Sequence, residues 1–143
     1  MKLHQFFNER ISDLAILYIK LHRFHWYIEG PSFYQLHEKY EELYDEATAL
    51  YDEFAERLLA IGGKPYATMK DYLAHGTISE EGNETDPKDI YATLIKDYEG
   101  QVNALKEGVK IAEDAGDDTS ADLFISTIGA LQKHLWMFKQ SSK

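Results

Sequence analysis

Apolar residues recur every three or four positions along almost the whole chain, and no stretch alternates convincingly between apolar and polar residues. Such spacing puts the apolar side chains on one side of an α-helix, whereas a half-buried strand would need a period of two. Glycine and proline are scarce and fall mainly in a few short clusters. The pattern therefore predicts an all-α protein whose long helices end at those clusters.

The breaks between helices are clear in the sequence. Gly30-Pro31-Ser32 ends the first helix, with Pro31 or Ser32 opening the second, and Asp86-Pro87 offers a cap followed by proline for a later start. The helices are expected over residues 3–29, 33–61, 69–74, 86–115 and 119–138. Four long helices, with the short one in the connection between the second and third, predict a four-helix bundle with one long crossover. At 143 residues, we expect a single domain spanning 1–143.

Composition narrows the classes of function. The chain carries a net charge of −10 and has no cysteine, which excludes disulfides and thiol catalysis and fits a cytoplasmic location. The start, MKLHQFFNER, has no apolar run typical of a signal peptide, and no stretch approaches the roughly 20 apolar residues of a membrane span. The negative charge disfavours contact with nucleic-acid phosphates and favours the capture of cations.

The expected second helix has a regular polar face opposite its apolar stripe of Leu36, Tyr40, Leu43, Ala47, Leu50, Phe54 and Ile61. This face carries His37, Glu41, Asp45, Thr48, Asp52 and Glu56. Considered one at a time, these residues are typical of a helix face that is exposed to solvent. Taken together, their numbers pair to a constant sum of 93: His37 with Glu56, Glu41 with Asp52, and Asp45 with Thr48. Two copies of the helix, crossing antiparallel about a two-fold axis near residues 46 and 47, would bring each pair together.

A metal site fits this symmetry only between two chains. His37 and Asp52 are about 22 Å apart along one helix, so they cannot bind the same ion within a chain. His25 and His37 are equidistant from Pro31, so the turn should make them neighbours in one subunit. With Glu41, and with Asp52 and Glu56 of the partner subunit, they would form a cluster suited to Fe(II), and less selectively to Zn or Mn.

A metal site inside one subunit's bundle is a competing hypothesis. Bundle-internal di-iron proteins use a Glu-x-x-His pair on each of two helices. None of the six histidines here has a glutamate three residues before it. The sequence therefore favours a site at an interface.

Residues 22–65, HRFHWYIEGPSFYQLHEKYEELYDEATALYDEFAERLLAIGGKP, closely resemble the Dps family, the miniature ferritins named for DNA protection in starved cells. The specific elements are His-Trp, a histidine twelve residues after the first, and D-x-x-x-E-R at 52–57; the ending KHLWMF at 133–138 extends the likeness. The resemblance covers essentially the whole chain and implies a fold of ferritin-like type.

The resemblance also implies a function. Proteins like this form dodecameric shells, oxidise Fe(II), usually with hydrogen peroxide in preference to dioxygen, and store ferric mineral inside. Two irons would bind in each inter-subunit site at the two-fold interface, with His25 and His37 from one subunit and Asp52 and Glu56 from the other. Glu41 stands where the family usually has a shorter aspartate, which should keep a carboxylate but move or weaken one iron position.

Several further residues have both a structural and a functional interpretation. Trp26 is either a packing aromatic or an electron donor when a single iron is bound. His22, one turn before His25, is interpreted as a plain surface histidine rather than as a residue that supports the metal ligands. Glu38 and Glu42 lie on another acidic stripe, which is either a solvated face or a surface that nucleates mineral. Asp122 opens the last helix, where the helix dipole favours carboxylates, and by resemblance it would line a three-fold pore.

Two other classes of function remain as alternatives. The resemblance implies that a DNA-coating stress protein would use a lysine-rich terminal tail, but only Lys2 precedes the apolar pattern, so we do not expect DNA binding at neutral pH. A metal-free helical adaptor would explain the apolar stripes but not the matched histidines. Iron-dependent consumption of peroxide would separate the ferroxidase from both.

Overall fold

The computed structural model describes all 143 residues and contains five α-helices and no strand. The helices are α1 (Lys2–Tyr27), α2 (Phe33–Ala60), α3 (Met69–His75), α4 (Pro87–Asp114) and α5 (Asp118–Ser141). This confirms the all-α prediction, including the short third helix. The chain divides into two compact units, one of His4–Pro87 and one of Met1–Leu3 with Lys88–Lys143. No helix combines the length and the apolar character that crossing a membrane requires.

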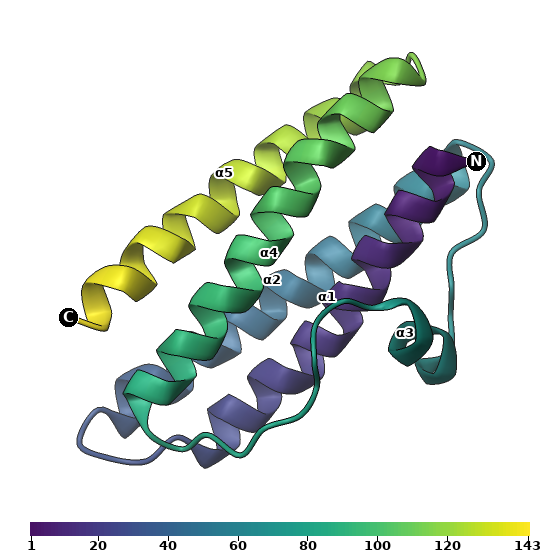
Figure 1. Ribbon diagram of the computed structural model, residues 1–143. Helices are drawn as coiled ribbons and strands as arrows, with labels where there is room; N and C mark the ends of the chain where they lie inside the picture. Colours follow the sequence, from purple (N-terminus) through teal and green to yellow (C-terminus); the bar gives the residue numbers. More distant parts are fainter. The chain divides into compact units, whose positions relative to one another are not determined.

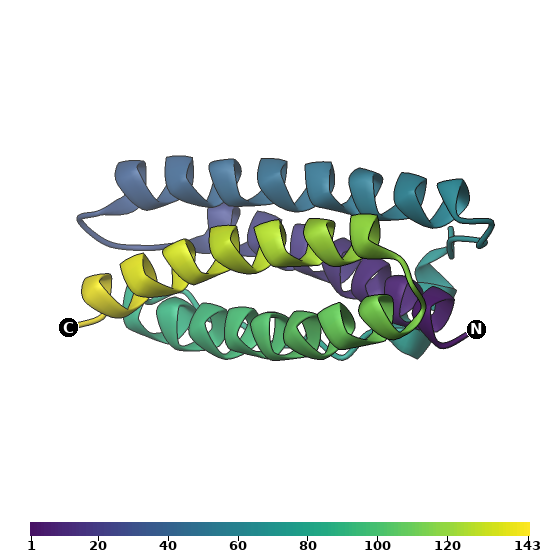
Figure 2. The same ribbon diagram turned by 90° about the horizontal axis from the view of Figure 1, so that it is seen from above.

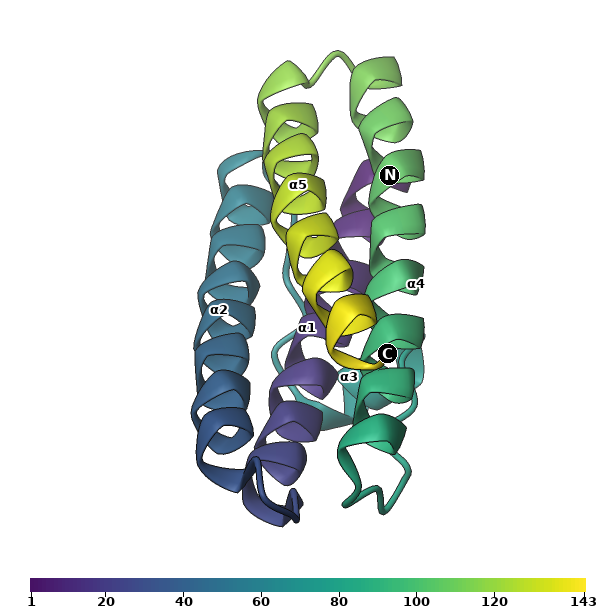
Figure 3. The same ribbon diagram turned by 90° about the vertical axis from the view of Figure 1, so that its left-hand side faces the viewer.

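In the unit His4–Pro87, α1 and α2 run antiparallel side by side (Figures 1 and 3). The turn between them depends on Gly30, whose φ of 115° lies in a region that favours glycine. Its carbonyl accepts a hydrogen bond from the backbone N–H of Phe33, at 3.1 Å, where α2 begins. Ser32 precedes α2 as one of the two expected starts, although its side chain makes no capping hydrogen bond.

The buried face of α2 differs in part from the predicted stripe. Tyr40, Leu43, Ala47, Phe54 and Leu58 are buried, and the ring of Phe54 packs edge-on against Phe7 of α1 at 5.9 Å. The remaining members of the predicted stripe, Leu36, Leu50 and Ile61, are only half-buried. The predicted stripe passed from Phe54 directly to Ile61 and so missed Leu58. Leu58 lies one helical turn after Phe54 and is buried, whereas Ile61 lies past the end of the helix.

The connection after α3 runs along α1 toward its C-terminal end (Figure 1). Asp13, which is fully buried, accepts hydrogen bonds from the backbone N–H groups of Thr77 at 2.5 Å and Ile78 at 3.0 Å, and from the Thr77 hydroxyl at 2.6 Å. It also pairs with Arg10 at 3.1 Å. Further along, the backbone N–H of Glu29 donates to the Thr85 carbonyl at 2.9 Å. Hydrogen bonds therefore hold the crossover against the α1–α2 hairpin both near its start, at Thr77, and near its end, at Thr85.

Replacing Asp13 by alanine is expected to destabilise the protein by about 3 to 5 kcal/mol, because two backbone N–H groups lose their acceptor and the buried Arg10 loses one of its partners. Burial already lowers the pKa of Arg10, although Asp13 and Glu9 oppose this effect. Urea unfolding at equal chain concentration would measure the change. Glu81→Ala, an exposed carboxylate in the same connection, is the control and should stay within about 0.5 kcal/mol. Equal stabilities for the two variants would contradict this account.

In the second unit, α4 and α5 form an antiparallel hairpin (Figure 2). Gly116, with φ of 71°, provides the turn, and Asp117 caps α5 by accepting hydrogen bonds from Ser120 N–H at 3.0 Å and Ser120 Oγ at 2.6 Å. The buried apolar residues of α5 include Phe124, Leu131, Leu135 and Phe138, which are seven, four and three residues apart and so lie on one side of the helix. The hairpin thus follows the predicted pattern.

Candidate functional site: a histidine pair at the α1–α2 turn

The structure places His25 and His37 against each other, as predicted. His25 lies in the last turn of α1 and is buried, and His37 lies near the start of α2 and is half-buried. Their rings stack with centroids 3.6 Å apart and an interplanar angle of 12°. The Gly30 turn therefore brings together two imidazoles that are twelve positions apart in sequence.

The two histidines hold each other through their backbones. His25 Nδ1 donates to the carbonyl of His37 at 2.5 Å, and His37 Nδ1 donates to the carbonyl of His25 at 2.7 Å. Because a carbonyl can only accept, each Nδ1 must carry a proton, which in a neutral ring leaves the Nε2 lone pair of each histidine available. This is how metal-binding histidines are usually oriented, with one nitrogen anchored and the other able to bind an ion.

Glu41 is the carboxylate closest to this pair within the chain. Its Oε1 lies 3.9 Å from His25 Nε2, and its side chain is 55% exposed while that of His25 is 8% exposed. The carboxylate therefore faces solvent beside an imidazole that is packed into the protein. One exposed carboxylate and two largely buried imidazoles make an incomplete set of donors for a divalent cation such as Fe(II).

Two aromatic residues, Phe33 and Tyr44, pack against the histidine pair. The sequence analysis did not single out either of them. Phe33 stacks on His37 at 5.0 Å, and Tyr44 meets His25 edge-on at 5.3 Å. Burial raises the pKa of Tyr44, and nearby Glu41 adds to the effect. The available signal was spacing: Phe33 precedes His37 by one helical turn and Tyr44 follows it by two, which places all three on one side of α2.

His22 is not the plain surface histidine that the sequence indicated. It is half-buried, its ring stacks on Tyr44 at 3.7 Å and 17°, and its Nδ1 donates to the Tyr18 carbonyl at 3.0 Å. Its ring also lies 5.3 Å from that of Trp26, which is 63% exposed. The prediction was wrong because the stack depends on a residue of the neighbouring helix, which spacing along α1 does not show.

The remaining residues of the polar face are exposed along α2, as predicted: Asp45, Thr48, Asp52 and Glu56. Because α2 is one continuous helix, Asp52 and Glu56 lie well beyond the reach of His25 and His37. Within one chain, no group of three or more His, Cys, Asp or Glu side chains could hold a metal ion. The chain thus presents two partial donor sets: His25 of α1 with His37 and Glu41 of α2, and Asp52 with Glu56 further along α2.

The other acidic residues singled out from the sequence lie on helix surfaces. Glu38 and Glu42 are exposed on α2, and Glu42 pairs with Lys39 at 3.4 Å. Asp122 is exposed in the second turn of α5.

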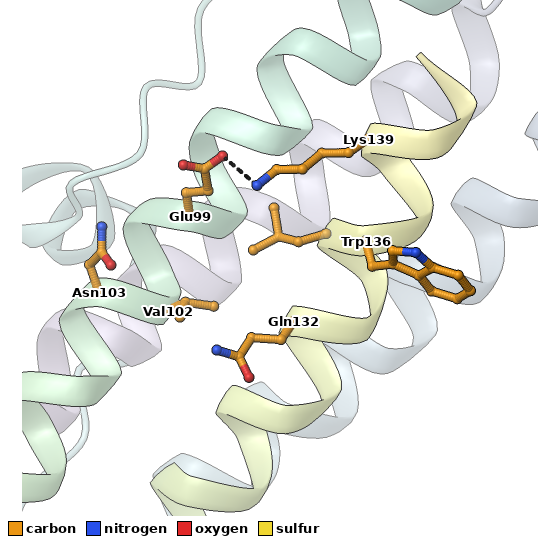
Figure 4. A pocket seen from close by; sticks show the side chains of 7 residues that line it. Glu99, Val102, Asn103, Gln132, Trp136 and Lys139 are labelled. Atoms are coloured by element: carbon orange, nitrogen blue, oxygen red, sulfur yellow. Dashed lines mark ion pairs between the residues drawn. The ribbon is translucent and has the colours of Figure 1, made fainter. Parts of the chain in front are cut away.

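A hollow of about 420 Å³ between α4 and α5 offers no comparable set of donors (Figure 4). Trp136 and Gln132 lie along it, and its one carboxylate, Glu99, is paired with Lys139 at 3.4 Å. It contains no histidine. The histidine pair at the α1–α2 turn is therefore the better candidate for metal chemistry.

Comparisons with known proteins agree on the family. The sequence model of the family described as "Ferritin-like domain" matches residues 5–141 of this chain. The chain is 45% identical over 132 residues to DNA protection during starvation protein 2 of Bacillus anthracis, a match covering 92% of this chain and 90% of that protein. It resembles the crystal structure of Dps from Staphylococcus aureus with a TM-score of 0.96 and 38% identity, covering 99% and 95% of the two chains.

Two structures of Dps from Listeria innocua are similarly close. One, from crystals soaked with zinc, has a TM-score of 0.93 and 35% identity, covering 96% of this chain and 94% of that one. The other has a TM-score of 0.94 and 33% identity, covering 96% and 92%, and carries glycine in place of two histidines. Those two histidines are as far apart in that sequence as His25 and His37 are here.

The likeness spans nearly the full length of each protein compared, at identities well above the level at which only a fold is shared. It also establishes the fold class as the ferritin-like four-helix bundle with a short extra helix between the second and third long helices. The chain belongs to the Dps family of ferritin-like proteins.

Proposed function

We propose that this protein is a ferroxidase and iron-storage protein, which oxidises Fe(II) and keeps the ferric product inside a hollow shell of twelve single-domain subunits. The observation that carries the proposal is the pair of stacked imidazoles, His25 and His37, each anchored through Nδ1 and each with Nε2 free for a metal ion. Glu41, 3.9 Å from His25 Nε2, adds an accessible carboxylate.

The remaining donors come from a second subunit. If two copies of α2 cross antiparallel, the constant sum of residue numbers puts Asp52 and Glu56 of the partner subunit opposite Glu41 and His37. The exposure of this face of α2 supports such a pairing, and so does the incomplete donor set within a single chain. Each two-fold interface would then hold two sites, one at each end of the crossing.

The mixed donor set suits the oxidation of iron. Carboxylates stabilise the higher charge of Fe(III), and imidazoles complete a coordination shell that leaves room for an oxidant. Two Fe(II) ions in one site can each give one electron to hydrogen peroxide, which with two protons becomes two molecules of water. Iron is then oxidised without release of hydroxyl radical, so we propose peroxide as the preferred oxidant.

Other residues would assist in the assembled shell. Trp26, which is exposed next to His25, would supply an electron when only one iron is bound. Glu38 would offer a surface for mineral growth, as would Glu42 when it is released from Lys39. Asp122 would line the pore through which iron enters. The longer side chain of Glu41 would shift or weaken one of the two iron positions.

Sizing the native particle before and after iron loading tests the assembly and the storage role together. Native mass spectrometry should find a dodecamer, and Fe(II) added with peroxide should elute with that particle as soluble ferric iron. A monodisperse single chain at micromolar concentration would overturn both the shell and the shared site. Iron that precipitates away from an intact dodecamer would overturn storage alone.

DNA coating is the second candidate function, and the name of the Bacillus anthracis relative favours it. The net charge of −10 per chain opposes contact with a polyanion. We therefore predict no gel shift of plasmid DNA near pH 7.5 in moderate salt without added divalent metal, because such metal can bridge two anions. A retarded complex under these conditions would show that the chain binds DNA directly. Removal of iron and peroxide would protect DNA without any contact.

A further inference from the structure

The stacked histidines are themselves held by two aromatic rings. Phe33, the first residue of α2, stacks on His37 at 5.0 Å with an interplanar angle of 19°. Tyr44 meets the ring of His25 edge-on, at 5.3 Å and 89°. We propose that Phe33 and Tyr44 are positioning residues, which form an aromatic clamp that holds both imidazoles ready for metal binding. The inference rests on the proposed function and identifies residues that act through the metal ligands.

Phe33 is well placed to orient His37. Its backbone N–H is tied to the Gly30 carbonyl at 3.1 Å, so the turn itself fixes the position of the residue. It precedes His37 by four residues, which puts both side chains on the same side of α2. The ring of His37 therefore lies in a stack with His25 and Phe33 and has little freedom to rotate.

Tyr44 is held just as firmly on the side of His25. The ring of His22 stacks on it at 3.7 Å, and that ring is anchored by the hydrogen bond from its Nδ1 to the Tyr18 carbonyl. Tyr18 also packs edge-on against Tyr44, at 5.8 Å. Tyr44 cannot swing away from His25 without losing both of these contacts.

The expected effect of the clamp is on affinity. A side chain that rotates freely must be immobilised when it binds a ligand, and this ordering weakens binding by about three- to tenfold for one rotamer-rich side chain. An imidazole held by the clamp has already lost this rotational entropy when the protein folds, so metal binding does not have to order it. Loss of the clamp should therefore weaken metal binding while leaving the chemistry of the loaded site unchanged.

The test uses Co(II) as a spectroscopic probe of the metal-free, fully assembled protein. Phe33→Leu and Tyr44→Leu are expected to weaken Co(II) binding about three- to tenfold, and to raise the half-saturating Fe(II) concentration with little change in the maximal oxidation rate. Phe33→Tyr and Tyr44→Phe keep the ring and should bind Co(II) as the unmodified protein does. Tyr34→Leu removes a ring that is 81% exposed and is the matched control.

The outcomes separate the clamp from the proposed function. If the unmodified assembled protein takes up no Co(II), the metal site itself is absent and the proposed function fails. If it binds Co(II) and both leucine variants bind equally well, the clamp is overturned while the metal site stands. Should a leucine variant not assemble, Phe33→Met or Tyr44→Met keeps most of the volume without a ring, and the same comparison decides.

Discussion

A variant lacking both His25 and His37 is expected to oxidise Fe(II) no faster than buffer, even with peroxide present. Replacing both by alanine removes the two imidazole Nε2 donors from every site, leaving three carboxylates that hold Fe(II) weakly. The double variant Asp52→Ala with Glu56→Ala should lose activity to the same extent, because it empties the other half of each site. Stopped-flow absorbance of the ferric product would measure both rates.

The control variants remove similar side chains from other positions. His75→Ala takes away an exposed histidine on α3, and Glu53→Ala takes away an exposed carboxylate next to Asp52 on α2. Both should keep the unmodified rate to within about twofold, since neither side chain belongs to the site. Full activity in either double variant, with assembly intact, would move the reaction away from the α1–α2 turn.

The rate of Fe(II) oxidation is expected to be higher with hydrogen peroxide than with dioxygen. Fe(II) supplied without oxygen, with one peroxide for every two irons, is expected to be oxidised quickly and completely. The same iron in air alone should react more slowly, because dioxygen needs four electrons for full reduction and each site supplies two. Residual peroxide, measured after the reaction, should fall to zero at this ratio.

Two results would contradict the reaction as proposed. Oxidation in air as fast as with peroxide would remove the oxidant preference while leaving a ferroxidase. Consumption of one peroxide per iron would mean that iron supplies only one of the two electrons that peroxide needs, so that the other comes from Trp26 or a hydroxyl radical is released. In that case the spectroscopic signature of an oxidised Trp26 should appear, and Trp26→Phe should abolish it.

The positions of the helices, and the contact between His25 and His37, could be predicted because both follow from local rules. Apolar spacing and the glycine clusters mark each helix, and two residues equidistant from a tight turn between antiparallel helices must meet. The solvent-facing side of α2 followed from the same periodicity, and Asp45, Asp52 and Glu56 are exposed as expected.

Contacts between distant segments could not be predicted in the same way. Asp13 binds Thr77 and Ile78, which lie more than sixty positions away, and nothing in the local pattern shows that the crossover passes there. The stack of His22 on Tyr44 likewise depends on the exact register of α1 against α2. Periodicity gives the side of a helix on which a residue lies, but not the ring that it meets on a neighbouring helix.

The central claim is that each metal site is built by two chains, and mixing the two double variants tests it most directly. The chain lacking His25 and His37 still offers the carboxylates, and the chain lacking Asp52 and Glu56 still offers the histidines. In a heterodimer of the two, one site lacks both the histidines and the carboxylates. The other site has the histidines of one chain and the carboxylates of its partner, and is complete. Dissociated and reassembled together, two inactive variants should therefore recover activity in proportion to the heterodimers counted by native mass spectrometry. If heterodimers form and oxidation stays at the buffer rate, the site is not shared as proposed.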